Sequence, residues 1–263
     1  MRDLRHRLSI ASHCGVFLMG NYQERFYRHQ PAPPCTVAFY VRYRASDLYV
    51  LVDDASYREH LQDILYGVLV ECHQTLADWF GEDERFCRSL EPYPLPEEAP
   101  PLARVMARAA GLAGVGPMAA VAGAIAQRVA GALEPEVRQV TVENGGDIYV
   151  RGGGTFRAGI FAGASPLSMR LALVAEPPVA ICTSSGTVGH SFSQGCADAA
   201  VVVGCDGALT DAIATALGNR VKRAEDIPGA LEWVKDKPGI QGAVIIFRDT
   251  MGAVGVTLEP VGT

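Results

Sequence analysis

The sequence has 263 residues, of which 49% are hydrophobic and 20% are charged, and its formal net charge is −6. This composition is typical of a folded globular protein and excludes a largely disordered chain. Because a nucleic-acid-binding protein needs a basic surface for the phosphates, the negative charge argues against nucleic acid as the main partner.

The N-terminal third contains one predicted hairpin and one predicted helix. Residues 1–30 are polar and aromatic, and their role cannot be read from the sequence. β-Forming residues at 35–43 and 47–52 predict a hairpin. Ser56 is the predicted N-cap of a helix that runs to about Phe80, because apolar residues recur at helical spacing after it.

A proline-rich connector at 91–101 is the best candidate for an internal boundary, although we expect residues 1–263 to form a single unit. After it we expect a helix at 102–110 and a second helix from Pro117 to Leu133. Residues 109–127 carry no charge, but most of them are small and offer little apolar area. We therefore expect no membrane span.

The C-terminal half is predicted to be rich in strands, with a turn at 144–146 and two helices. The first helix follows the strand at 199–203 and ends near Gly218, and the second covers 228–235. The other strands are predicted at 137–142, 147–150, 156–161, 169–174, 179–182, 242–247 and 253–258. Because helices and strands come in blocks, the predicted fold class is α+β with mixed or antiparallel sheets.

The seven cysteines include no C-x-x-C pair and no Cys/His spacing of a zinc site. Reduced thiols are therefore expected, which favours a cytoplasmic location. The N-terminus mixes charges and lacks an apolar core, so we expect no signal peptide.

Asp211 and Thr215 lie four residues apart in a predicted helix, so their oxygens project from the same face one turn apart. A carboxylate and a hydroxyl in this arrangement suit Mg²⁺, which takes oxygen ligands. The alternative is ordinary helix chemistry, in which the aspartate interacts with the helix dipole and the threonine bonds the preceding turn.

Two loops are candidates for ligand contact. In the first, Gly145 and Gly146 would let a ligand approach the backbone while Asp147 or Glu143 fixes a hydroxyl or ring nitrogen. The alternative is a plain hairpin, because Asn-Gly is a strong turn signal. The second loop, 183–191, offers hydroxyls and unhindered amides but has neither a P-loop lysine nor a G-x-S-x-G elbow. Its His190 could equally be a structural hydrogen bonder.

Taken in order, five segments resemble the ApbE superfamily, the FAD:protein FMN transferases, and an uncharacterised ApbE-like branch more closely. These segments are 115–126, 142–149, 161–163, 182–191 and 211–215. The resemblance implies an ApbE-like fold and a flavin or related dinucleotide phosphate held partly through Mg²⁺. It implies that the metal ligands are Asp211, Thr215 and the carbonyl of Ala126. It implies an FAD site formed by Asn144, Gly145, Gly146, Asp147, Thr183, Ser184, Ser185 and Gly186.

The sequence also departs from the pattern of the enzymes. No D-P-x-T-G segment follows His190, and Gln127 stands where the enzymes carry a lysine. Loss of a cation and of a catalytic loop would weaken stabilisation of charge on a transferred phosphoryl group.

Three functions therefore stay open at this point. The first is Mg²⁺-dependent transfer of FMN from FAD to a hydroxyl of an acceptor protein, with His190 or Asp147 as proton acceptor. The second is a carrier that binds flavin or another nucleotide without turnover, and the third is a hydrolase of another phosphorylated ligand. The sequence does not identify the ligand or the acceptor, and it leaves open whether the chain forms a homo-oligomer.

Overall fold

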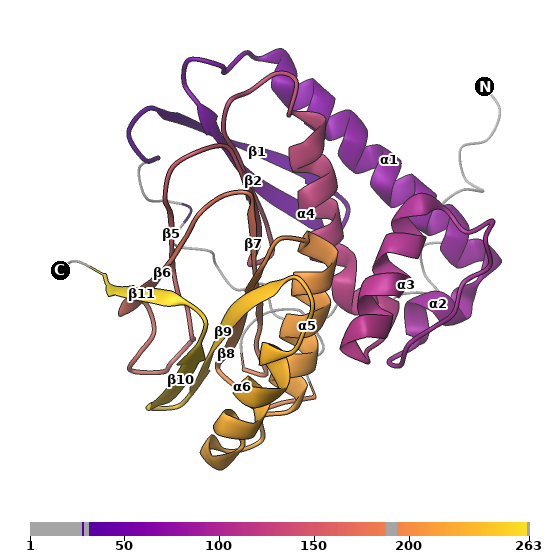
Figure 1. The fold of residues 1–263 in the computed structure, drawn as a ribbon. Coiled ribbons are helices and arrows are strands. Elements are labelled where there is room, and N and C mark those ends of the chain that lie inside the picture. The colour runs from indigo at the N-terminus through magenta and orange to yellow at the C-terminus, as the bar shows by residue number, and fades with distance from the viewer. Residues whose placement is uncertain (1–27, 29–31, 188–193, 262–263) are drawn as a thin grey trace.

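The structure, a computed structural model, describes residue 28, residues 32–187 and residues 194–261. Its centre is an eight-stranded sheet in which every neighbouring pair is antiparallel (Figure 1). From one edge to the other, its strands are β1 (Thr36–Tyr43), β2 (Ser46–Asp53), β3 (Val140–Asn144), β4 (Asp147–Arg151), β7 (Val179–Ser184), β8 (Ala199–Gly204), β9 (Ile240–Phe247) and β10 (Thr250–Val254).

A second, three-stranded sheet contains β5 (Phe156–Gly159), β6 (Leu171–Ala175) and β11 (Thr257–Pro260), with β6 in the middle. The single final strand predicted at 253–258 is wrong. Gly255, with φ of 65°, breaks the chain between β10 and β11, which pair with strands of different sheets.

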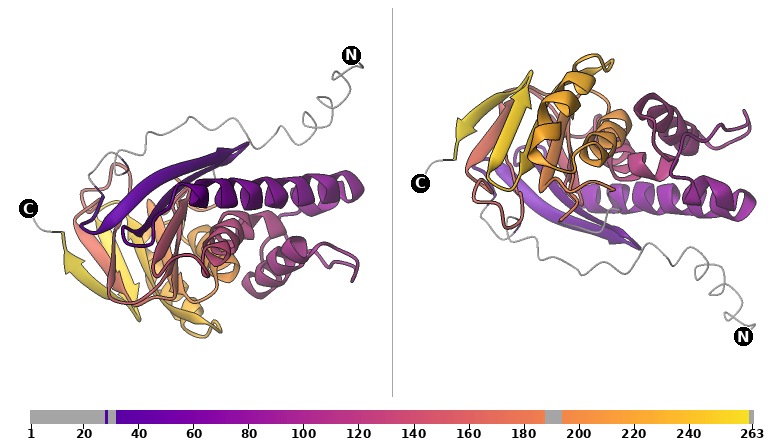
Figure 2. Two further views of the ribbon diagram at one scale, coloured as in Figure 1. Left: turned by 90° about the horizontal axis from the view of Figure 1, so that it is seen from above. Right: turned by 90° about the horizontal axis from the view of Figure 1, so that it is seen from below.

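The helices are α1 (His60–Glu82), α2 (Glu84–Arg88), α3 (Pro101–Ala113), the 3₁₀ helix η4 (Pro117–Ala120), α4 (Val121–Ala132), α5 (Gly207–Asn219), η5 (Ala224–Asp226) and α6 (Ile227–Lys235). Figure 1 shows them on one side of the large sheet, with the small sheet on the other. In both views of Figure 2 the C-terminal strands lie at the opposite end of the molecule from α2 and α3. The predicted α+β class is confirmed.

Burial on both faces explains why β8 is apolar along its whole length. Ala200 and Val202 pack in the core beneath α3, α5 and α6, while Val201 and Val203 pack beneath the small sheet. All six residues of β8 are buried. A strand covered on both faces needs a continuous apolar run instead of an alternating one.

The first long helix begins later than predicted, at His60 and not directly after Ser56. The Asp53 carboxylate accepts a hydrogen bond from the Ser56 amide at 3.0 Å, so these residues form a turn before the helix. Burial alone would raise the pKa of Asp53, but hydrogen bonds from Ser56 and from the amides of Gln139 and Arg138 outweigh it, and the pKa is lowered. The predicted apolar face is confirmed, with Leu61 fully buried.

The predicted pair of helices after the connector is longer and more irregular than the sequence suggested. The first ends at Ala113, where Gly114 adopts a left-handed conformation, and the second begins as a 3₁₀ turn at Pro117. Among the described residues no single helix is long and apolar enough to cross a membrane, although the two segments 101–113 and 117–132, bent by 101°, pass that test together.

The connector forms neither helix nor strand between residues 89 and 100. Its Tyr93 and Leu95 nevertheless pack against the core cluster that contains residues of α3 and α5. Whether a domain boundary lies here stays a prediction.

Candidate functional site

The predicted turn between β3 and β4 is present, but its residues are shifted by one. Asn144 is the last residue of β3 and pairs with Asp147, so the chain turns on Gly145 and Gly146. Their φ angles are 73° and 110°, which residues with a side chain rarely adopt. A β-carbon on Gly146 would meet nothing within 4 Å, so the space beside the turn is open.

The polar side chains that flank the turn bind neighbouring elements on the helical side of the large sheet. Asn144 donates from Nδ2 to the carbonyl oxygen of Ala122 at the start of α4, at 3.1 Å. Asp147 accepts a hydrogen bond at Oδ1 from the backbone amide of Thr183 in β7, at 3.2 Å. Both side chains are buried. The turn is thereby joined to α4 and to the start of the loop at 183–187.

Asp211 reaches the same region from α5. Its Oδ2 accepts a hydrogen bond from the amide of Gly123 in α4 at 2.9 Å, and the residue is 9% exposed. The two helices cross very closely here. A β-carbon on Gly123 would lie 2.1 Å from the carbonyl oxygen of Gly207, and one on Gly207 would lie 2.5 Å from that of Gly123. Small residues are therefore required on both helices, which explains the glycine- and alanine-rich segment noted in the sequence.

The electrostatics of this region are dominated by buried negative groups. Burial raises the pKa of Asp211 well above its ordinary value, and the nearby charge of Asp147 raises it further, while hydrogen bonds from Gly123 and Ala122 oppose the shift. Burial also raises the pKa of Cys182, again with the two aspartates adding to the shift. No salt bridge joins Asp211 to a basic side chain among the described residues.

The other two predicted metal ligands, Thr215 and Ala126, lie on α5 and α4. Thr215 is half-buried one turn beyond Asp211 on α5, and Ala126 is fully buried within α4, where helix carbonyls accept from the amide four residues on. In the described part of the chain, no three His, Cys, Asp or Glu side chains group as a metal site would need. The metal-binding roles of Asp211, Thr215 and Ala126 stay predictions.

The loop after β7 uses several of its own hydroxyls internally. Ser185 Oγ accepts from the Thr187 amide at 3.1 Å, and Thr187 Oγ1 donates to Asp198 at 2.9 Å. The Ser184 hydroxyl is buried and has no hydrogen-bond partner among the described residues. A β-carbon on Gly186 would lie 2.2 Å from the carbonyl oxygen of Gly195, so close packing requires glycine at position 186. His190 lies outside the described residues.

Gln127 has a contact that the sequence did not reveal. Its Oε1 accepts a hydrogen bond from the amide of Gly207, the first residue of α5, at 2.6 Å. The side chain thus satisfies one of the amides that a helix N-terminus leaves unpaired. In this chain the position is used to join two helices.

The side chain of Glu143 points to the opposite face of the sheet from Asp147, where Arg28 contacts it. Sequence reasoning left residues 1–30 without a role and therefore missed Arg28. The signal that could have indicated a basic partner was Glu143 itself. It lies at the end of an apolar strand, and a carboxylate that is buried there needs a counter-charge.

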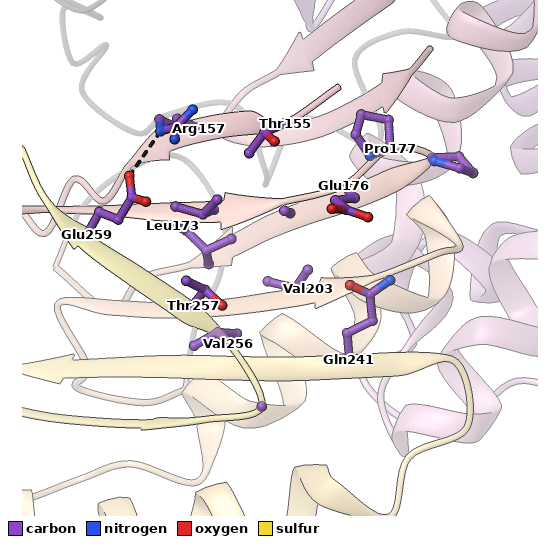
Figure 3. A pocket seen from close by; sticks show the side chains of 14 residues that line it. Thr155, Arg157, Leu173, Glu176, Pro177, Val203, Gln241, Val256, Thr257 and Glu259 are labelled. Carbon is purple, nitrogen blue, oxygen red and sulfur yellow. Dashed lines mark hydrogen bonds and ion pairs between the residues drawn. The ribbon is translucent and has the colours of Figure 1, made fainter. Parts of the chain in front are cut away.

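A hollow of about 780 Å³ lies elsewhere, between the small sheet and strands β8 and β9 of the large sheet (Figure 3). Leu173 and Val203 line it, and the ion pair of Arg157 with Glu259 lies at one end. None of the predicted site residues that the structure describes lines it. It adjoins the end of β7 at Pro178, whereas the candidate site adjoins the other end of that strand.

Comparison with known proteins identifies the family. A model of the family described as "AbpE bacteria" matches residues 29–231. The chain belongs to this family. One relative of this chain is a UPF0280 protein of Methanocella arvoryzae. It is 39% identical over 209 residues, which cover 78% of this chain and 83% of the relative. A UPF0280 protein of Methanosarcina acetivorans is 42% identical over 188 residues, covering 69% and 73%.

Solved structures with a similar fold include two flavin transferases. The flavin transferase ApbE from Vibrio cholerae superposes with a TM-score of 0.56 at 14% identity, covering 86% of this chain and 98% of that one. The apo flavinyl transferase ApbE of Pseudomonas stutzeri gives 0.53 at 14% identity, covering 86% and 94%. The predicted ApbE-like fold and the resemblance to an ApbE-like family are confirmed, while identity at this level carries the fold alone.

Proposed function

We propose that this protein binds a flavin dinucleotide, FAD, together with Mg²⁺ at the site between the Gly145-Gly146 turn, α4, α5 and the loop at 183–187. The observation that carries the proposal is Asp211, a buried carboxylate beside a second buried carboxylate, Asp147. Two buried carboxyl groups in one place favour a bound cation, because an opposite charge beside them favours their ionised forms.

The donor chemistry fits Mg²⁺. Asp211 supplies a carboxylate and Thr215 a hydroxyl from the same helix, and Mg²⁺ commonly uses one or two carboxylates with its other positions left to waters and phosphate oxygens. When bound, the ion would neutralise charge on the pyrophosphate. The open space beside Gly146 would let a ligand approach the turn, and the Thr183 to Gly186 segment would supply hydroxyls and amides.

An FMN transferase would need Asp147 or His190 to accept the proton from a hydroxyl of an acceptor protein. Asp147 is buried and bound to the Thr183 amide, so it is held in place at the site. Gln127, however, is occupied at the N-terminus of α5 and brings no positive charge to a phosphate. This favours the second candidate, a carrier that holds FAD without turning it over, with hydrolysis as the third outcome.

Calorimetry with FAD, with and without Mg²⁺, tests the binding proposal. The natural chain should bind FAD more tightly with Mg²⁺, and Asp211→Ala should lose the Mg²⁺-dependent part. Asp78→Ala is the matched control, because it removes the same charge from an exposed position on α1. Absence of FAD binding to the natural chain would refute the flavin assignment, and equal Mg²⁺ dependence in both variants would refute only the metal assignment.

The products formed from FAD and Mg²⁺ then separate the functions. Flavin attached covalently to an added protein indicates transfer, FMN with AMP indicates hydrolysis, and unchanged bound FAD indicates a carrier. We expect these reactions in the cytoplasm, a proposal supported by the free thiols of Cys72 and Cys182.

A further inference from the structure

Arg28 is a buried arginine that precedes β1 and packs on the face of the large sheet opposite the helices. Only 6% of its surface is exposed. Its guanidinium lies 5.9 Å from the ring centroids of both Tyr40 and Tyr49, and the Tyr40 hydroxyl donates to its carbonyl oxygen at 3.1 Å. The two rings lie side by side, 5.2 Å apart, and a cation beside them and out of water is stabilised by both.

The guanidinium connects two acidic residues on neighbouring strands. Nε donates to Glu143 Oε2 at 2.6 Å, a second nitrogen contacts Asp47 Oδ2 at 3.0 Å, and a third bonds the carbonyl oxygen of Asp47 at 2.8 Å. Glu143 is only 4% exposed. Removing the cation would take the ion-pair partner from the Oε2 of a buried carboxylate, which is a costly change in a protein core.

Glu143 connects Arg28 to the turn of the candidate site. While Oε2 binds Arg28, Oε1 accepts a hydrogen bond from the amide of Gly146 at 2.8 Å. The carboxylate therefore has one oxygen on the arginine and the other on the turn whose next residue is Asp147. Gly146 has a wide choice of backbone conformations, so an external anchor is needed to select one.

We propose that Arg28 is a positioning residue for the candidate site, acting through Glu143 on the Gly145-Gly146 turn and hence on Asp147. Its effect on ligand binding rests on the proposed function, whereas its effect on the turn does not. The N-terminal segment thereby contributes to a site whose other residues all come from positions 122 to 215.

Amide exchange at Gly146, measured by NMR, tests the first step without any ligand. Arg28→Met should accelerate exchange at this amide, because Glu143 loses its anchor. Arg42→Ala is the matched control: Arg42 pairs with the same Asp47, but on the surface, and does not contact Glu143. Unchanged exchange in Arg28→Met, or the same acceleration in Arg42→Ala, would overturn the proposal.

Binding of FAD with Mg²⁺ tests the second step. Arg28→Met should raise Kd by about 3- to 30-fold, a range typical of residues that act through others. The double variant Arg28→Met/Glu143→Gln should recover most of the affinity, because an amide still accepts from Gly146 but needs no counter-charge. A purely structural role would leave the double variant as weak as the single one.

Arg28→Lys keeps the charge and provides a folded variant if Arg28→Met is too unstable to study. It should give an intermediate Kd and intermediate exchange, because an ammonium cannot copy the guanidinium fork. Natural affinity in Arg28→Lys and in a folded Arg28→Met would overturn the link to the site. If the natural chain itself does not bind FAD, the proposed function fails, and exchange at Gly146 alone decides whether Arg28 positions the turn.

Discussion

Replacing Gly123 by alanine would force α4 and α5 apart. The new β-carbon would lie 2.1 Å from the carbonyl oxygen of Gly207, about 1.3 Å closer than the 3.4 Å at which ordinary contact begins, and 2.8 Å from Cβ of Asp211. The oxygen it meets belongs to the backbone, so relief requires movement of a helix and not of a side chain. That movement also lengthens the hydrogen bond from the Gly123 amide to Asp211.

Three effects set the expected cost. Overpacking of a core costs about 1–3 kcal/mol, and weakening of a hydrogen bond costs up to about 0.5–1.5 kcal/mol. The gain in helix propensity returns about 1 kcal/mol. The net destabilisation should be about 2 kcal/mol, which for a chain of this size lowers Tm by roughly 4–8 °C.

Thermal and urea denaturation followed by circular dichroism measure this loss. Gly131→Ala, on the same helix, is the control, because its β-carbon would meet nothing within 4 Å. It should stabilise the protein by about 0.5–1 kcal/mol. If Gly123→Ala is as stable as the natural chain, α4 and α5 do not cross as closely as described, and the placement of Asp211 beside α4 is wrong.

Two further predictions concern single hydrogen-bonding side chains. Gln127→Lys removes the acceptor for the Gly207 amide, so urea denaturation should show that the free energy of unfolding falls by about 1–2 kcal/mol. The control Arg128→Ala, at an exposed position, should change it by less than about 0.5 kcal/mol. Equal effects of the two substitutions would contradict the role of Gln127 in joining α4 to α5. Asp53 has a lowered pKa in the folded protein, so its contribution is present above the unfolded-state value near 4 and is lost as the pH falls through the folded value. Asp53→Asn should therefore flatten the acid side of the stability curve, while Asp54→Asn, at an exposed neighbour, should leave its slope unchanged.

The sequence was most informative where one local signal decided the structure. Apolar spacing predicted the buried face of α1, and the glycine turn predicted the β3–β4 hairpin. It was least informative where a long-range contact decided. Asp53 binds the amides of Arg138 and Gln139 as well as that of Ser56, and no local pattern contains the first two contacts. The segment 253–258 carries no local sign that its two halves join different sheets.

The candidate site shows the same division. The segments around Asn144, Asp147 and Asp211 were found in the sequence because their motifs are contiguous, and the fold brings them to one place. Gln127 was identified only as a departure from the enzymes, since its partner Gly207 lies 80 residues away. Arg28 lies 115 residues from Glu143, and sequence reasoning missed their contact.

The small sheet has a consequence for how the chain is made. β5 and β6 leave the ribosome well before β11, which borders β6 on its other side. Until residues 257–260 emerge, β6 has one edge without this neighbour, and such an edge offers its N–H and C=O groups to other chains. The apolar residues of β7 and β8 that the small sheet covers also wait for its third strand. Synthesis of residues 176–256 is therefore a period in which β6 of the nascent protein can pair with another chain.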